Sequence, residues 1–171
     1  MKIVLLGYMG CGKSVIGTFL AKKLSVPFID LDHEIEKYTE QTIAEIFKGK
    51  GEIYFRKKEH EVFKTLVNKP DEFVLSLGGG TPCYYNNHEL LQNEGVVSIY
   101  LKASVDTLVS RLSNEKENRP LLHMHDENSL KDFINKHLFD RNYYYYQATK
   151  TIVVDDKSVN QIVDEIASIL A

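Results

Sequence analysis

A glycine-rich turn that directly follows an apolar run is the feature that most restricts what this chain can fold into. Residues 7–14 read GYMGCGKS, which fits the pattern G-x-x-x-x-G-K-[ST], and residues 2–6 before them read KIVLL. Glycines let the backbone curl so that its N–H groups point at phosphate oxygens, and the positive end of the following helix adds to this attraction. An ordinary tight turn needs no Lys-Ser pair. The turn therefore predicts a site for a nucleoside triphosphate.

The polar residues of this turn each have a part in holding ATP together with Mg²⁺. The ammonium of Lys13 would neutralise charge on the β and γ phosphates, and we expect it to face solvent when no phosphate is near. The hydroxyl of Ser14 would bind Mg²⁺. The expected ATP-binding segment consists of Gly10, Cys11, Gly12, Lys13, Ser14 and Val15.

Short apolar runs alternate with amphipathic segments along the chain. Runs typical of strands buried on both faces occupy residues 2–6, 26–30, 73–77, 96–101 and 151–154. Apolar residues recur with helical spacing, Val15 and Phe19 among them, within 15–24, 105–112 and 159–169. This alternation predicts a three-layer α/β/α fold around a five-stranded parallel sheet, in which ligands bind at the carboxyl ends of the strands.

The segment after the second apolar run is predicted to be helical. TIAE at 42–45 matches the T-x-x-E capping box that opens a helix, GKG at 49–51 ends that helix, and helical spacing resumes from 52 to 67. The polar stretch 113–129 has weak periodicity and is expected to be a surface segment rather than a domain boundary. We therefore expect a single domain covering residues 1–171.

Charge and cysteine content argue against several classes of protein. A net charge of −3 gives no general attraction to nucleic acid. The first apolar run is too short for a signal peptide, and no run has the roughly twenty apolar residues needed to span a bilayer. Two cysteines are too few for a disulfide framework. We expect a cytoplasmic monomer with small-molecule substrates and without a nucleic-acid or membrane partner.

Two carboxylates close the second apolar run and face the predicted phosphate site. Asp30 and Asp32 in DLD stand where the next parallel strand should end. Residues two apart in an extended chain point the same way, so one carboxylate could serve the metal while the other accepts a hydroxyl proton. This division suits phosphoryl transfer to an alcohol. The alternative is that Asp32 is a plain N-cap for the helix that follows.

Six motifs together resemble the shikimate kinase family of P-loop small-molecule kinases. They are GYMGCGKS, DLD, TIAEIFKGKGEIYFRKKE, GGG, RPLL and RNYYYY, in the family's order and at near-family spacing over almost the whole chain. The resemblance implies a nucleoside-monophosphate-kinase-like fold with a substrate-binding insert at about 31–68 and a lid at about 113–127. It also implies transfer of the γ-phosphoryl group of ATP to the 3-hydroxyl of shikimate, in the biosynthesis of aromatic amino acids.

The resemblance assigns roles on the acceptor side of the site. It implies that Asp32 contacts the substrate hydroxyls and is the base, and that Asp30 helps Ser14 to hold Mg²⁺ through water. Arg56 and Arg141 would hold the substrate carboxylate, because a planar guanidinium pairs with a carboxylate in a directed way.

Neighbouring residues would support these arginines and the substrate. Glu59 lies one helical turn after Arg56 and could orient it. Gly78, Gly79 and Gly80 would permit close approach of the backbone to the substrate, although a loose strand-to-helix turn would explain them as well.

Two further arginines belong to the nucleotide side of the resemblance. Arg119 in the lid would bring a positive charge onto the transferring phosphoryl group when the lid closes and excludes water. Arg111 resembles the family's adenine-stacking arginine, but the stretch from Arg111 to Arg119 is one residue longer than expected. The chain also departs from the family pattern at Glu40, where glycine is frequent, and at 143–146, where four tyrosines replace a stretch that contains proline.

Several alternatives stay open at this point. A gluconate or nucleoside monophosphate kinase would share the phosphate site but lack the DLD and Phe-Arg motifs, and a nucleotide-sensing module would bind ATP without turnover. His123 and His125 are more often solvated than metal ligands when no further ligand stands at fixed spacing. The tyrosines of 143–146 suit either an aromatic binding surface or a half-buried helix face.

Overall fold

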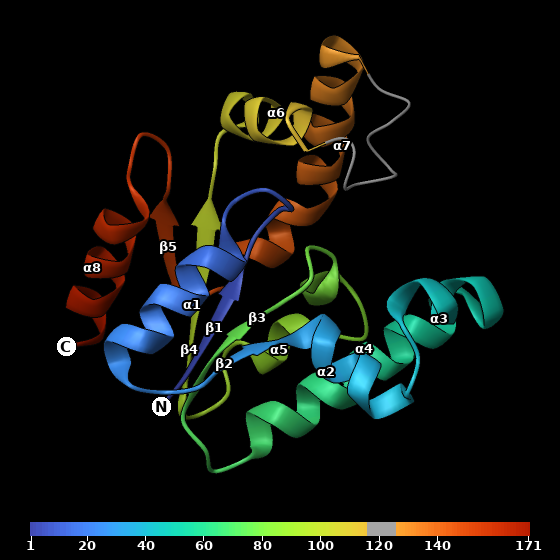
Figure 1. The fold of residues 1–171 in the computed structure, drawn as a ribbon, viewed down its shortest axis with the longest axis vertical. Helices are drawn as coiled ribbons and strands as arrows, with labels where there is room; N and C mark the ends of the chain where they lie inside the picture. Colours follow the sequence, from blue (N-terminus) through green and yellow to red (C-terminus); the bar gives the residue numbers. More distant parts are fainter. Residues whose placement is uncertain (116–125) are drawn as a thin grey trace.

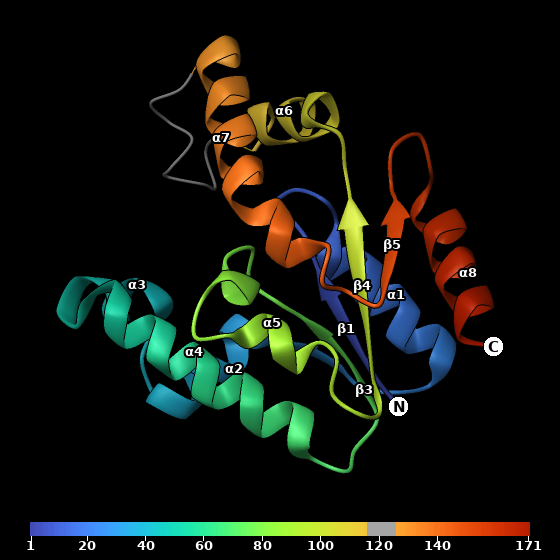
Figure 2. The ribbon, with the colours of Figure 1, turned by 180° about the vertical axis from the view of Figure 1, so that it is seen from behind.

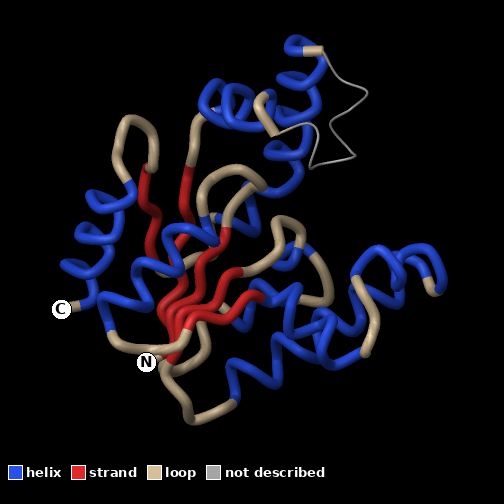
Figure 3. Tube along the Cα trace, viewed as in Figure 1, coloured by secondary structure: helices blue, strands red, loops and turns tan. Residues whose placement is uncertain are grey.

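A five-stranded parallel sheet forms the centre of the molecule (Figures 1 and 3). The computed structural model describes residues 1–115 and 126–171. The strands stand side by side in the order β2-β3-β1-β4-β5. Their bounds are β1 (Lys2–Leu6), β2 (Phe28–Asp30), β3 (Phe73–Ser76), β4 (Val96–Lys102) and β5 (Lys150–Val153). The predicted α/β class and five-stranded parallel sheet are therefore confirmed.

Helices cover both faces of this sheet. α1 (Lys13–Leu24) and α8 (Val159–Leu170) pack together on one face, while α5 (Asn87–Leu90) and the C-terminal part of α7 (Glu127–Tyr145) lie on the other (Figures 1 and 2). The remaining helical segments are α2 (Leu31–Thr39), α3 (Ile43–Gly49), α4 (Gly51–Asn68), the 3-10 turn η1 (Thr81–Cys83) and α6 (Val105–Ser113). α2, α3 and α4 extend from the β2 edge of the sheet (Figure 1).

The helical segment between β2 and β3 forms as its sequence predicts. Thr42 caps α3, because its hydroxyl accepts from the backbone N–H of Glu45 while the Glu45 carboxylate accepts from the Thr42 N–H. The chain then turns at Gly51, whose φ of +86° favours glycine over other residues. α4 begins there and carries Arg56 and Glu59 on consecutive turns.

The inner strands are buried and the two edge strands are not. Every residue of β3 and most residues of β1 and β4 are buried, whereas β2 is only half-buried and β5 is largely exposed. The expectation that all five runs are buried on both faces was wrong for these two strands, because each stands at an edge of the sheet beside a single neighbouring strand. In α1, likewise, Val15 and Phe19 are about half exposed, at 52% and 50%.

Candidate active site

Three neighbouring strands bring the predicted site residues to one edge of the sheet. Asp30 pairs with Ser76 in register, and Ser76 pairs with Leu5, so β2, β3 and β1 end side by side. A cavity of about 470 Å³ opens at this edge. Its lining includes Gly10, Cys11, Gly12, Lys13, Ser14, Val15, Asp30, Asp32, Gly78, Gly79 and Arg111. The glycine-rich turn and both carboxylates therefore share one cavity.

Lys13 folds back onto the glycine-rich turn. The turn ends at Gly12, whose φ of +104° favours glycine, and α1 begins at Lys13. The ammonium Nζ donates to the carbonyl oxygens of Gly7 at 2.7 Å and Tyr8 at 3.2 Å. Our expectation of a solvent-facing Lys13 was wrong, because the curled backbone turns these carbonyl oxygens toward the ammonium. These two carbonyl oxygens are uncharged acceptors that hold the ammonium over the turn. Charged phosphate oxygens bind an ammonium more strongly and can replace them.

The two aspartates lie where β2 ends and α2 begins, and only Asp30 has an extended backbone. Asp30 is the N-cap of α2, and its Oδ1 accepts from the backbone N–H of His33 at 3.1 Å. Asp32 stands in the first turn of α2. Both our argument from extended geometry and the alternative of Asp32 as the cap were therefore wrong. The two carboxylates still line the same cavity.

The carboxyl group of Asp32 holds its proton more tightly than an ordinary aspartate. Partial burial in the cavity wall, followed by the negative charges of Asp30, Glu59 and Glu36, raises its pKa to about 6, against a smaller opposing effect of Lys13. The side chain remains exposed along the cavity, so solvent reaches it although protein surrounds most of it. A carboxylate with a pKa near neutrality is a better proton acceptor than one with a pKa near 4.

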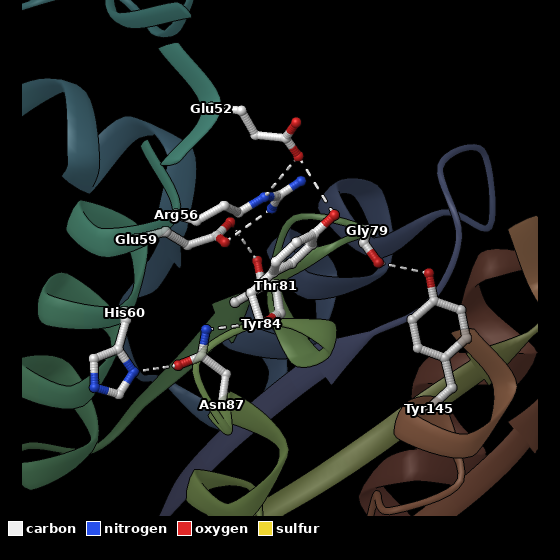
Figure 4. Close-up of polar contacts among 9 residues, drawn as sticks. All are labelled: Glu52, Arg56, Glu59, His60, Gly79, Thr81, Tyr84, Asn87 and Tyr145. Atoms are coloured by element: carbon white, nitrogen blue, oxygen red, sulfur yellow. Dashed lines mark hydrogen bonds and ion pairs between the residues drawn. The ribbon is translucent and has the colours of Figure 1, made fainter. Parts of the chain in front are cut away.

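Arg56 is fixed by a buried carboxylate (Figure 4). Its Nη1 donates to Oε1 of Glu59 at 2.9 Å, and Oε2 of Glu59 accepts from the hydroxyl of Thr81 at 2.8 Å. Glu59 is only 1% exposed, and the guanidinium also stacks on the ring of Tyr84, 4.1 Å from the ring centre. The sequence suggested the Arg56–Glu59 pair, but Thr81 and Tyr84 carried no signal that would have identified them.

The glycine triplet brings both predicted carboxylate-binding arginines together. A Cβ on Gly80 would lie 2.7 Å from Nη2 of Arg56, and a Cβ on Gly79 would lie 3.1 Å from a guanidinium nitrogen of Arg141. A Cβ on Gly78 would lie 3.7 Å from Oδ1 of Asp32. Two cations and one carboxylate from three helices thus stand beside three consecutive glycines, and a side chain at Gly80 would displace Arg56 while one at Gly79 would crowd Arg141.

The cavity wall also carries a second group of cations. Nη1 of Arg111 donates to the carbonyl oxygens of Gly10 at 3.1 Å and Cys11 at 3.2 Å. Lys157 and Val159 line the cavity with Arg111, and Lys157 is paired with Glu165 at 2.7 Å. Lys157 was not identified from the sequence.

Part of the prediction lies outside the described residues. Arg119, His123 and His125 fall within 116–125, and most of the predicted lid does too. Within 1–115 and 126–171, no three His, Cys, Asp or Glu side chains cluster as metal ligands would. In the same ranges, no helix has the length and apolar character that crossing a membrane requires.

Comparison with known proteins agrees with this geometry. A sequence model described as shikimate kinase matches residues 9–171. The shikimate kinase of Flavobacterium psychrophilum is 56% identical over 99% of this chain and 98% of its own length. The chain belongs to the shikimate kinase family. Membership makes it an ATP-dependent kinase of aromatic amino acid biosynthesis, as the sequence predicted, and favours neither alternative function.

Solved shikimate kinases share the fold over the full length. The enzyme from Bacteroides thetaiotaomicron superposes with a TM-score of 0.89 at 35% identity, covering 99% of this chain and 98% of that one. The enzyme from Acinetobacter baumannii, solved in complex with shikimate, gives a TM-score of 0.85 at 32% identity, covering 99% and 92%. The shikimate kinase likeness thus extends from sequence motifs to the whole backbone.

Proposed function

We propose that this chain transfers the γ-phosphoryl group of ATP to the 3-hydroxyl of shikimate, with the acid held at the Gly78–Gly80 triplet. The observation that supports this most strongly is the position of two guanidinium groups against adjacent glycines, with Asp32 against the third. Arg56 and Arg141 are far apart in sequence, and a small acid is the acceptor that gives their convergence a purpose.

Asp32 is the base in this proposal. Its carboxylate accepts the proton of the 3-hydroxyl while the hydroxyl oxygen forms a bond to the γ phosphorus and the bond from that phosphorus to the bridging oxygen of ADP breaks. The raised pKa of Asp32, about 6, supports this role, because the group is ionised at neutral pH and still basic enough to take a proton. Arg56 and Arg141 orient the substrate by its carboxylate.

The glycine-rich turn binds the phosphates. In this proposal the backbone N–H groups of Gly10, Gly12 and Val15 face the phosphates, while the N–H of Cys11 donates to the carbonyl oxygen of Tyr8 and holds the turn. Lys13 exchanges its two carbonyl partners for the β and γ phosphate oxygens. This exchange strengthens as negative charge develops on the transferring group.

Ser14 and Asp30 are the proposed Mg²⁺ residues. Both line the cavity, and a hydroxyl and a carboxylate are the hard oxygen donors that Mg²⁺ prefers, so these residues fit the ion. Bound Mg²⁺ supplies charge neutralisation on the phosphates. One carboxylate oxygen of Asp30 accepts the capping hydrogen bond of α2, which is consistent with Asp30 contacting Mg²⁺ through a water molecule.

Arg111 and Arg119 complete the nucleotide side. Arg111 lines the same cavity and is proposed to stack on adenine. Arg119, within the segment that is not described, is proposed to reach the transferring phosphoryl group as the lid at about 113–127 closes. We further propose a single domain with a substrate-binding insert at about 31–68, acting as a monomer in the cytoplasm.

A coupled assay of ADP formation tests this proposal. Shikimate should support turnover, while gluconate, nucleoside monophosphates and shikimate without its 3-hydroxyl should not. Asp32→Asn should lower kcat by at least about a hundredfold and change KM for shikimate little, since an amide keeps hydrogen bonds but cannot take the proton. A pure rise in KM would reduce Asp32 to a substrate-orienting residue, and equal turnover of another acceptor would overturn the substrate.

A further inference from the structure

The tyrosine run at 143–146 contains one residue unlike its neighbours. Tyr143 and Tyr146 are 65% and 49% exposed, whereas Tyr145, the last residue of α7, is fully buried. Its ring packs tilted against Tyr100, with ring centres 5.1 Å apart. A fully buried tyrosine must place its hydroxyl on a partner, because an unpaired buried hydroxyl is costly.

The partner of this hydroxyl is the glycine triplet (Figure 4). Tyr145 donates to the carbonyl oxygen of Gly79 at 2.6 Å. The carbonyl oxygens on either side have backbone partners, since Gly78 accepts from the N–H of Thr81 and Gly80 accepts from the N–H of Cys83. The middle carbonyl, that of Gly79, accepts its hydrogen bond from a side chain instead. Tyr145 therefore fixes the one peptide of the triplet whose carbonyl the local backbone does not hold.

Arg141 stands beside the same glycine peptide. It lies four residues earlier on α7, and a Cβ on Gly79 would lie 3.1 Å from its Nη1, so the guanidinium and the Tyr145 hydroxyl meet at Gly79. Burial raises the pKa of Tyr145, so the hydroxyl keeps its proton for Gly79 at any pH the enzyme meets. The lone pairs of the oxygen remain for the guanidinium, which can only donate.

We propose that Tyr145 is a positioning residue for the acceptor: its hydroxyl joins the Gly79 peptide and the Arg141 guanidinium into one unit that orients the bound acid. The proposal rests on the proposed carboxylate-binding role of Arg141. Tyr145 acts through these two groups and does not itself touch the reacting atoms. Its influence therefore falls on the acid and not on ATP, whose phosphates meet the glycine-rich turn.

Tyr145→Phe tests the proposal, because phenylalanine keeps the ring that packs on Tyr100 and removes only the hydroxyl. We expect a rise of about fivefold to twentyfold in KM for shikimate and less than a twofold change in KM for ATP. Tyr143→Phe is the matched control, since that hydroxyl belongs to an exposed side chain of the same helix, and it should leave both values unchanged. Replacing Tyr145 with para-aminophenylalanine, which restores a donor, should recover part of the loss.

A double-mutant cycle with Arg141→Ala distinguishes failure of the role of Tyr145 from failure of the proposed carboxylate-binding role of Arg141. If Tyr145 acts through Arg141, the second substitution should add less than twofold to the loss caused by Arg141→Ala. Losses that multiply in full, or equal rises in KM for both substrates after Tyr145→Phe, would overturn the role of Tyr145. An Arg141→Ala variant with normal KM for shikimate would instead overturn the proposed role of Arg141. Should Tyr145→Phe not fold, the para-aminophenylalanine variant still decides, because its KM for shikimate should then rise by less than the roughly fivefold expected for loss of the donor, and a larger rise would overturn the role of Tyr145.

Discussion

Glu59 and Arg56 form an ion pair of 2.9 Å in which the carboxylate is 1% exposed and the guanidinium side chain 14%. Thr81 donates to the second carboxylate oxygen at 2.8 Å and thereby fixes the orientation of Glu59. The fixed carboxylate in turn holds the guanidinium of Arg56 in one position. The arginine is thereby held against Gly80 before any substrate arrives. Orientation set in advance lowers the entropy lost on binding.

Glu59→Gln should weaken both the fold and the binding of the acid. The amide can satisfy Thr81 or Arg56 but removes the charge that pairs with the guanidinium. We expect the free energy of unfolding to fall by about 1–3 kcal/mol and KM for shikimate to rise, measured by urea denaturation and steady-state kinetics. Glu61→Gln is the control, because Glu61 pairs with Lys58 near the surface and should change stability by no more than about 0.5 kcal/mol. Equal effects of the two substitutions would contradict the role given to Glu59.

Gly80→Ala should act on the acid site through Arg56. The backbone at Gly80 has φ of −93°, so alanine fits the backbone, but its Cβ would lie 2.7 Å from Nη2 of Arg56. The guanidinium must move, and we expect a loss of about tenfold in kcat/KM for shikimate with KM for ATP unchanged. Gly49→Ala is the matched control, since no atom lies within 4 Å of a Cβ there. Normal kinetics of Gly80→Ala would show that the position of Arg56 against the triplet does not matter.

Asp32 should titrate well above an ordinary aspartate. In the ligand-free protein, carboxyl resonances followed by NMR, and assigned with Asp32→Asn, should give a midpoint near the pKa of about 6. Because the native chain then holds a proton that the unfolded chain has lost, this group makes the free energy of unfolding fall as pH rises from about 4 to about 6. As a base, Asp32 loses function in the opposite direction, as pH falls below 6. A midpoint near 4 would remove the argument that its surroundings tune it.

Lys13→Ala should abolish turnover and leave the fold intact. The bonds from Lys13 to the carbonyl oxygens of Gly7 and Tyr8 are made by a half-buried side chain, so water can replace the ammonium. We expect kcat to fall by at least about a hundredfold and the melting temperature to change by only a few degrees. Lys23→Ala is the control, because Lys23 lies on the same helix in an exposed pair with Asp164 and should leave kcat unchanged. Substantial activity of Lys13→Ala would contradict the phosphate site.

The sequence predicts the sheet and the glycine-rich turn because both depend on local patterns. Strand periodicity and the Lys-Ser pair need no knowledge of distant residues. The geometry of Asp30 and Asp32 was predicted wrongly, since α2 begins at Leu31, two residues earlier than an extended DLD requires, and local spacing does not decide between a strand end and a helix cap.

Contacts between distant segments lie beyond such patterns. The meeting of Arg56 and Arg141 at Gly79 and Gly80 came only from resemblance to a family, because no rule of spacing joins α4 to α7. Tyr145 carried no distinguishing signal within a run of four tyrosines. Its bond to Gly79 depends on which face of α7 packs on the sheet. Position in the fold selects one tyrosine where the sequence shows four alike.

A double cycle on the substrate carboxylate tests the central claim most directly. Wild type and Arg56→Ala are each assayed with shikimate and with the analogue that carries a neutral amide in place of the carboxylate. Losing a hydrogen bond to a charged group should lower kcat/KM of Arg56→Ala for shikimate by about tenfold to a hundredfold, while KM for ATP stays unchanged. If Arg56 binds the carboxylate, replacing shikimate by the amide analogue should lower kcat/KM of Arg56→Ala little further. If the two losses simply add, Arg56 does not bind the carboxylate, and the acid site described here is wrong.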